Sequence, residues 1–179
     1  MKQRFLCAFG ILLALLFCVN GQQTGPQKPA PKSSFEYEPE CGDPTVESMS
    51  WTPIDGTVVE IIAGDLVKLR DNAGKERMVN LVAIEASSAK GAATSLLSQL
   101  VLDRNVEVIV NPTNSKSHML VGVLQLAGKD VNRELLEAGA VQYKSPAAYS
   151  VSNYTACVYR IVERNAREAG KGMWQLANP

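Results

Sequence analysis

The sequence predicts a mainly β fold with added α-helices, built as a small closed barrel of five strands with about three helices. Three observations predict it. From Trp51 onward, alternating and aliphatic runs are bounded by turn residues, which is typical of strands joined in hairpins. One helical pattern separates the third run from the fourth, and two more follow the fifth. Five strands in this order fit a Greek-key barrel of the oligonucleotide/oligosaccharide-binding type.

The first three strands form a predicted meander. Residues 57–62 and 66–70 flank the Gly64 corner, where Asp65 stands at the tip of an otherwise apolar hairpin. The Asp-Asn-Ala-Gly stretch that follows is a turn signal. It leads to a predicted third strand over residues 76–84.

Two further strands and three helices complete the predicted barrel. Ser87 or Ser88 caps the first helix, and Asp130 caps the second. Gly139 and Gly170 end the second and third helices, because glycine readily adopts the backbone conformation that follows a helix. The predicted strands cover 105–110 and 119–126, and the predicted helices 89–100, 131–138 and 153–169.

Residues 1–21 have the anatomy of a secretory signal peptide. Lys2 and Arg4 precede the mostly apolar residues 5–19, and a short pattern of small and polar residues ends at Gly21. A membrane anchor is one alternative, but its span needs roughly 20 apolar residues. Lipid modification of Cys18 is another. The pattern predicts a secreted or extracytoplasmic protein, in the periplasm or at the cell surface, with no transmembrane span in the mature chain.

Residues 22–50 predict a flexible linker, and residues 51–179 a folded domain. The linker holds five of the nine prolines, with Gln, Ser and acidic residues but almost no aliphatic side chains. It therefore buries too little apolar surface to offset the entropy lost on ordering. Loss of the leader removes two basic residues and no acidic ones, which changes the net charge from 0 to −2. This charge balance does not indicate a polyanionic partner.

Two cysteines remain after the leader is removed, Cys41 and Cys157. In an oxidising compartment two cysteines predict one disulfide bond. The alternative is that Cys157, on the apolar face of the last helix, is a small buried core residue.

Four stretches, in order and at nearly the same spacing, resemble the staphylococcal nuclease-like (thermonuclease) family. They are DGTVVEIIAGDLVKL, RMVNLVAIEASS, GKDVNRELLEAGAV and AREAGKGMW. The resemblance runs from about Ile54 to Trp174. It implies a five-stranded barrel that carries a calcium-dependent phosphodiesterase site acting on DNA or RNA.

The resemblance also implies a set of site positions. Asp65 and Glu85 match the two acidic residues that hold calcium in active members, although the second of these is an aspartate there. Ser88 stands where active members have the glutamate assigned as general base. Asn80 and Met119 stand where they have two arginines.

These departures bear directly on catalysis. Hydrolysis of a phosphodiester needs a base that activates water and cations that balance the developing charge. Serine is no base at neutral pH, and asparagine and methionine carry no charge. A lost base costs roughly 10²–10⁴ in rate and a lost transition-state donor roughly 10²–10³. His118, next to Met119, is a candidate substitute; the alternative is a solvated loop histidine.

The sequence therefore supports two functional hypotheses. The first is an exported, catalytically degenerate nuclease-like protein that acts as a binding or scaffolding module for an unidentified ligand, with nucleic acid suggested by the resemblance. The second is a weak calcium-dependent nuclease. Two carboxylates are few for calcium, which takes roughly 6–8 oxygen ligands, so the sequence predicts at most weak calcium binding and no other cofactor.

A basic surface is a further candidate site. Four basic residues recur at near-helical spacing on the last predicted helix and just beyond it, and such a stripe is able to meet phosphates. Glu163 and Glu168 lie at spacings that allow local ion pairs, which favours a solvated face instead. The basic residues are Arg160, Arg164, Arg167 and Lys171.

Overall fold

The computed structural model describes residues 38–43, 51–86, 90–110, 112, 115–116, 118–146 and 151–176. All of these belong to one compact unit, Ser33–Pro179. The predicted leader, most of the predicted linker and Ser88 lie outside the described residues. Within the described part of the chain, no helix is long and apolar enough to span a membrane.

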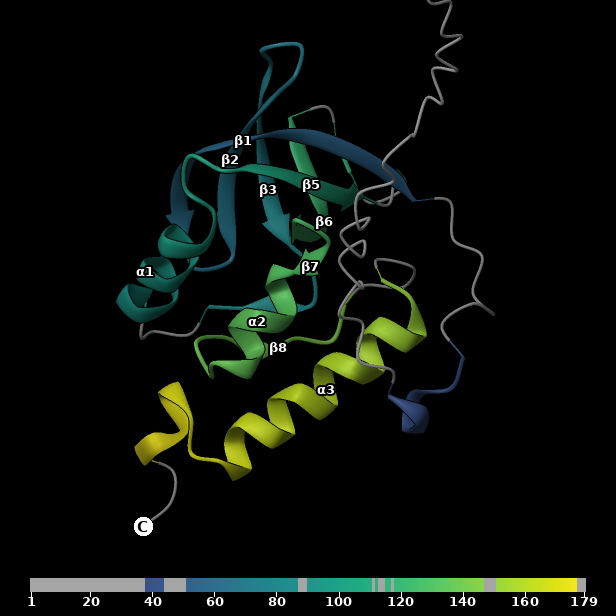
Figure 1. Ribbon diagram of the computed structural model, residues 1–179, viewed down its shortest axis with the longest axis vertical. Helices are drawn as coiled ribbons and strands as arrows, with labels where there is room; N and C mark the ends of the chain where they lie inside the picture. Colours follow the sequence, from purple (N-terminus) through teal and green to yellow (C-terminus); the bar gives the residue numbers. More distant parts are fainter. Residues whose placement is uncertain are drawn as a thin grey trace, which may run out of the picture. The chain divides into compact units, whose positions relative to one another are not determined.

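The predicted five-stranded barrel is confirmed (Figure 1). Neighbouring strands pair antiparallel in the order β3-β2-β1-β5-β6, and a parallel pairing of β3 with β6 closes the sheet on itself. The short strand β7 (Lys129–Asp130) extends β6 as a hairpin. The barrel strands are β1 (Thr52–Ala63), β2 (Leu66–Asp71), β3 (Glu76–Leu81), β5 (Asn105–Val110) and β6 (Met119–Leu126).

Strict alternation along the strands fills the barrel interior. Successive side chains of a strand point to opposite faces, so every second residue faces inward. The inward residues are fully or nearly fully buried and aliphatic, among them Val58, Val67, Leu69, Val79, Leu81, Val106, Val108, Leu120 and Leu124. Because burial of apolar surface is the dominant favourable term in folding, this interior is the main source of stability.

β1 is longer than the predicted strand. Residues 52–57 pair with β5 and residues 56–63 pair with β2, so that 56 and 57 pair with both neighbours. Two register shifts, between Val58 and Glu60 and between Ile61 and Ala63, let the strand curl from one partner to the other. Gly56 lies at the changeover. A Cβ there would come within 2.5 Å of the Arg70 carbonyl oxygen, so only glycine fits this close approach.

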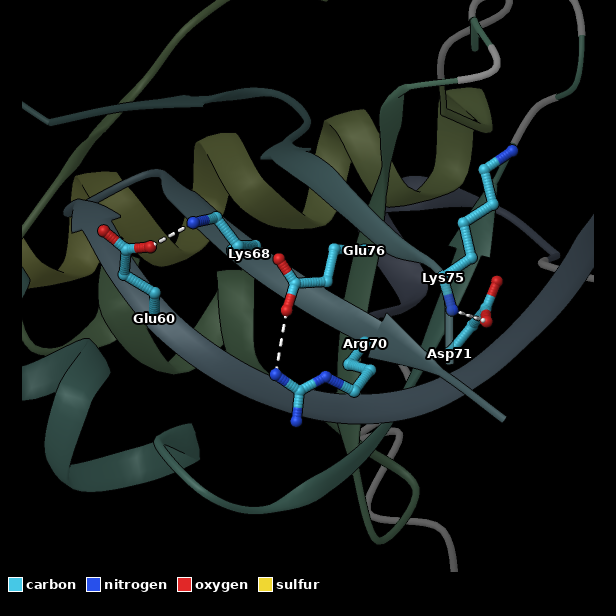
Figure 2. Close-up of polar contacts among 6 residues, drawn as sticks. All are labelled: Glu60, Lys68, Arg70, Asp71, Lys75 and Glu76. Carbon is cyan, nitrogen blue, oxygen red and sulfur yellow. Dashed lines mark hydrogen bonds and ion pairs between the residues drawn. The ribbon is translucent and has the colours of Figure 1, made fainter. Parts of the chain in front are cut away.

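Opposite charges line the outer face of the β1-β2-β3 meander (Figure 2). Glu60 forms an ion pair with Lys68, and Arg70 contacts Glu76 at 2.8 Å. At the β2–β3 turn, Asp71 accepts a hydrogen bond from the Lys75 amide at 2.9 Å, which lowers the pKa of Asp71. Exposed pairs of this kind are screened by solvent, so they add little to the stability of the fold.

The prediction of a single third strand over residues 76–84 is wrong. β3 ends at Leu81, and a turn follows in which Ala83 has φ 60°. The chain then enters β4 (Ile84–Glu85), which pairs with β8 (Gln142–Tyr143) in a separate two-stranded sheet. The reason is tertiary: the Val82 amide still donates to the Gly122 carbonyl oxygen of β6 at 3.0 Å, but the next residues pair with β8 instead of with a barrel strand.

The three α-helices are α1 (Lys90–Val101), α2 (Val131–Glu137) and α3 (Asn153–Glu168). α1 packs against β1, and α2 packs against both β6 and α3 (Figure 1). The predicted cap of α2 is present, because Asp130 accepts a hydrogen bond from the Arg133 amide at 3.0 Å. Ser152 caps α3 in the same way, through the Thr155 amide.

A strap of six residues, 38–43, docks on α3. It contains the short helix η1 (Pro39–Cys41), and Cys41 is joined to Cys157 by a disulfide bond, with the two Cα atoms 5.6 Å apart. The Glu38 amide donates to the Tyr154 hydroxyl at 3.1 Å. The disulfide therefore links Cys41, inside the predicted linker, to α3, 116 residues further along the chain.

Asp130 has a second role, as a partly buried carboxylate beside the buried Tyr159. The Tyr159 hydroxyl donates to Asp130 at 2.7 Å. Burial raises the pKa of Asp130 above its ordinary value, although the hydrogen bonds from Tyr159 and the helix amides oppose the rise. Burial and the neighbouring Asp130 charge together raise the pKa of Tyr159 well above 10.

The stability of the fold should therefore depend on pH through Asp130. Between the unfolded and folded pKa values, the folded protein holds a proton that the unfolded chain has released. The stabilisation that Asp130 gives the fold through this proton is thus fully present below its ordinary pKa. It is lost as pH rises through the pKa of Asp130 in the folded protein. We expect the unfolding free energy of wild type, measured by urea titration relative to Asp130→Asn, to rise as pH falls from 7 toward 4. A difference that does not vary with pH would contradict this, and Asp55→Asn, at an exposed position, serves as the control.

Candidate functional site

Asp65 stands at the tip of the β1–β2 hairpin and is tied to the chain beyond β3. Its carboxylate Oδ2 accepts a hydrogen bond from the Ala86 amide at 3.1 Å, and its carbonyl oxygen accepts one from the Leu81 amide at 2.9 Å. Gly64 before it packs tightly on α1, because a Cβ at this position would come within 2.4 Å of the Ala93 Cβ. The corner is therefore held in one place by contacts with two other elements.

A cavity of about 230 Å³ lies beside this corner. Asp65 and Asn80 both line it, so the structure brings together two of the predicted site positions. The opposite wall comes from the segment that follows β8. The lining residues are Asp65, Asn80, Leu81, Val82, Ala83, Ile84, Val121, Lys144, Ser145 and Pro146.

Lys144 is the charged residue that sequence reasoning missed. Its Nζ lies 2.7 Å from Oε1 of Glu85, and its backbone amide donates to the Ala83 carbonyl oxygen at 3.0 Å. The hydrogen bond and charge of Glu85 raise the pKa of Lys144, and the Asp65 charge adds to the rise. No local pattern marks this lysine, since it lies between two helices and 59 residues from Glu85.

Met119 and His118 do not line the cavity. Met119 begins β6, where its parallel pairing with Met78 places it on the same outer face of the barrel as Asn80. His118 lies in the exposed turn before β6, and its carbonyl oxygen accepts a hydrogen bond from the Met78 amide at 3.0 Å. The predicted arginine positions thus share one face, but only Asn80 reaches the cavity.

The family model of the staphylococcal nuclease homologues matches residues 75–176. This chain belongs to the staphylococcal nuclease family. The match covers more than half of the chain and includes β3, the helices and the segment that carries Lys144. It begins after the hairpin that carries Asp65. No curated protein matches this sequence.

The nuclease family implies calcium at this site, and the side chains present do not fit that ion. Calcium takes roughly 6–8 oxygen ligands, with carboxylates as the strongest. One carboxylate oxygen of Asp65 accepts a hydrogen bond from the Ala86 amide, and Glu85 forms an ion pair with the ammonium of Lys144. Among the described residues, no group of three or more His, Cys, Asp or Glu side chains is arranged to hold a metal ion.

The predicted basic surface of this nuclease homologue is divided among separate contacts. Arg164 lies 3.8 Å from Glu40 of the strap, and Arg167 lies 3.1 Å from Glu163. The Arg167 guanidinium also stacks over the Trp174 ring at 3.9 Å. Arg160 and Arg164 line one cavity together with Glu40 and Cys157, while Lys171 lines a different one. Acidic side chains thus pair with two of the four basic residues, and the basic surface as a phosphate-binding site stays a prediction.

Proposed function

We propose that this member of the staphylococcal nuclease family is exported, has lost catalysis, and acts as a binding or scaffolding module. The observation that carries the proposal is the composition of the Asp65 cavity. Among the described residues that line it are an amide, a hydroxyl and one ammonium, and none of them carries a guanidinium. Phosphodiester hydrolysis needs positive groups aimed at the phosphoryl oxygens and a base free to activate water.

The state of the two carboxylates supports the same proposal. Asp65 accepts a backbone hydrogen bond, and Glu85 is paired with Lys144. A general base must be within reach of the attacking water and free to accept its proton. Asn80, at the position of a family arginine, offers a neutral amide instead of a charge. Mutational effects of groups that act together do not multiply, but each loss by itself is large.

Two observations support export. The leader has a basic start followed by the apolar run 5–19. The strap is joined to α3 by a disulfide bond, and disulfide bonds persist mainly in oxidising compartments outside the cytosol. We propose that the protein is secreted or held outside the cytoplasm.

The proposed loss of catalysis is tested by digestion. The purified protein is incubated with single- and double-stranded DNA and with RNA, in calcium and in chelator, and acid-soluble nucleotides are measured. We expect no cleavage above that of Asp65→Ala in any condition. Calcium-dependent cleavage that disappears in Asp65→Ala would overturn the proposal in favour of a weak calcium-dependent nuclease.

A repair variant serves as the positive arm of this assay. If the barrel retains the geometry of the family and only the reactive groups are lost, the triple variant Asn80→Arg, Ser88→Glu, Met119→Arg should acquire measurable cleavage. A folded triple variant without cleavage would show that more than these three groups separates the cavity from an active site.

A further inference from the structure

The cavity beside Asp65 contains a positive charge that belongs to the chain itself. β4 pairs with β8, with Ile84 opposite Tyr143 and Glu85 opposite Gln142. Lys144 follows β8, and its amide continues the ladder by donating to Ala83. Lys144 is therefore the diagonal neighbour of Glu85, within reach of a long side chain, and its ammonium contacts the carboxylate at 2.7 Å.

The backbone fixes this placement on both sides. The Asp65 carboxylate accepts a hydrogen bond from the Ala86 amide, and the Asp65 carbonyl oxygen accepts one from the Leu81 amide. The hairpin tip is therefore anchored to the segment that carries Glu85. Lys144 lines the same cavity as Asp65. The Lys144 ammonium thus contacts Glu85 of β4 and lines the same cavity as Asp65 of the hairpin tip, at the place where family resemblance expects a divalent cation.

An ammonium and a calcium ion compete for the same carboxylates. The ammonium is a donor with no lone pair, so it is never a metal ligand. Its charge also repels a second cation at short range. We propose that Lys144 is a built-in replacement for the divalent cation, so that its ammonium partly offsets the charge of Asp65 and Glu85 without calcium and any ligand is recognised independently of that ion.

This inference concerns the same cavity as the proposed function and rests on it for the role of the cavity as a binding site. The cation that lies beside Asp65 and Glu85, the Lys144 ammonium or calcium, is a separate matter from catalysis. Both side chains are about half exposed, at 61% for Lys144 and 51% for Glu85. Replacement of the lysine therefore removes a charge without opening a buried void, and the fold should tolerate it.

The test is calorimetric titration of calcium chloride into chelator-treated protein at low ionic strength. We expect no saturable binding by wild type at millimolar calcium. We expect Lys144→Met to bind calcium at least about tenfold more tightly than wild type, since an adjacent unit charge shifts the affinity of a carboxylate for a cation by roughly one to three orders of magnitude. Addition of Glu85→Gln to Lys144→Met should abolish that gain.

Two controls make every outcome decisive. Lys144→Arg keeps the positive charge and should behave as wild type, whereas Lys129→Met removes an exposed lysine of β7 and should change nothing. Calcium binding by wild type, or a Lys144→Met variant with a native circular dichroism spectrum and no gain in affinity, would overturn the inference. Neither result depends on nucleic-acid cleavage, and cleavage by wild type would overturn the proposed function while leaving this inference to be judged by calcium binding alone.

Discussion

Replacement of both Cys41 and Cys157 by serine is expected to lower the free energy of unfolding by up to about 4–5 kcal/mol. The reason lies in the unfolded chain: the bond closes a loop of 116 residues, and opening such a loop returns a large conformational entropy to the unfolded state. The full effect requires the strap to stay docked on α3 after the bond is lost, because a strap that detaches also gains entropy in the folded state.

Urea unfolding of wild type and of the double variant measures this effect. Glu40→Gln is the matched control. It removes a carboxylate of the strap that lies 3.8 Å from Arg164, in a largely exposed ion pair. Its loss should lower the free energy of unfolding by less than about 1 kcal/mol. The free thiols of the denatured, unreduced protein are counted in parallel. Equal stability of wild type and the double variant, or thiol reactivity of Cys41 and Cys157 in wild type, would contradict the prediction.

Asn132→Leu is expected to destabilise the fold by about 2–4 kcal/mol. Asn132 is the fully buried polar residue of the core, with 0% of its surface exposed. Its Oδ1 accepts a hydrogen bond from the Leu124 amide at 3.2 Å, and its Nδ2 donates to the Val82 carbonyl oxygen at 2.9 Å. Leucine keeps the branched shape and the number of side-chain heavy atoms but leaves both backbone groups buried without a partner, at a cost of roughly 1–3 kcal/mol each.

The same change at Asn165 is the control for this prediction. Asn165 lies on the exposed side of α3, so Asn165→Leu should change the unfolding free energy by no more than about 0.5 kcal/mol. If Asn132→Leu proves equally mild, the side chain does not tie α2 to β6 and to the turn after β3. Amide hydrogen exchange at Leu124 should also accelerate in Asn132→Leu, because the donor loses its acceptor.

Local physics accounts for how much of the barrel could be predicted. Strict alternation of aliphatic residues, as in Val67 and Leu69 of β2, indicates one buried face whatever the partner strand is. Asp130 was predicted as a cap because a short acidic side chain before a helical pattern satisfies free amides within its own turn. Such signals depend on neighbours along the chain, so they are readable without the fold.

The candidate site was readable only in part. Asp65 stands out as a charge at an apolar hairpin corner, and the family resemblance supplied Glu85, Asn80 and Met119. The separation of Met119 from the cavity could not be predicted, because it depends on the parallel register between β3 and β6. That register joins segments about 40 residues apart, and the sequence of neither strand specifies it alone.

The sequence by itself determined the approximate positions of the five barrel strands, the Asp130 cap and the uncharged residues at the family's reactive positions. The tertiary structure decided where β3 ends and which cation faces Glu85. An alanine at φ 60° is unfavourable locally, yet Ala83 adopts this conformation. The Val82 amide before it donates to Gly122 of β6, and the Ala83 carbonyl oxygen accepts from the Lys144 amide that follows β8. Those same long-range hydrogen bonds place the Lys144 ammonium beside Glu85, since backbone pairing between distant segments fixes side-chain positions that no local pattern contains.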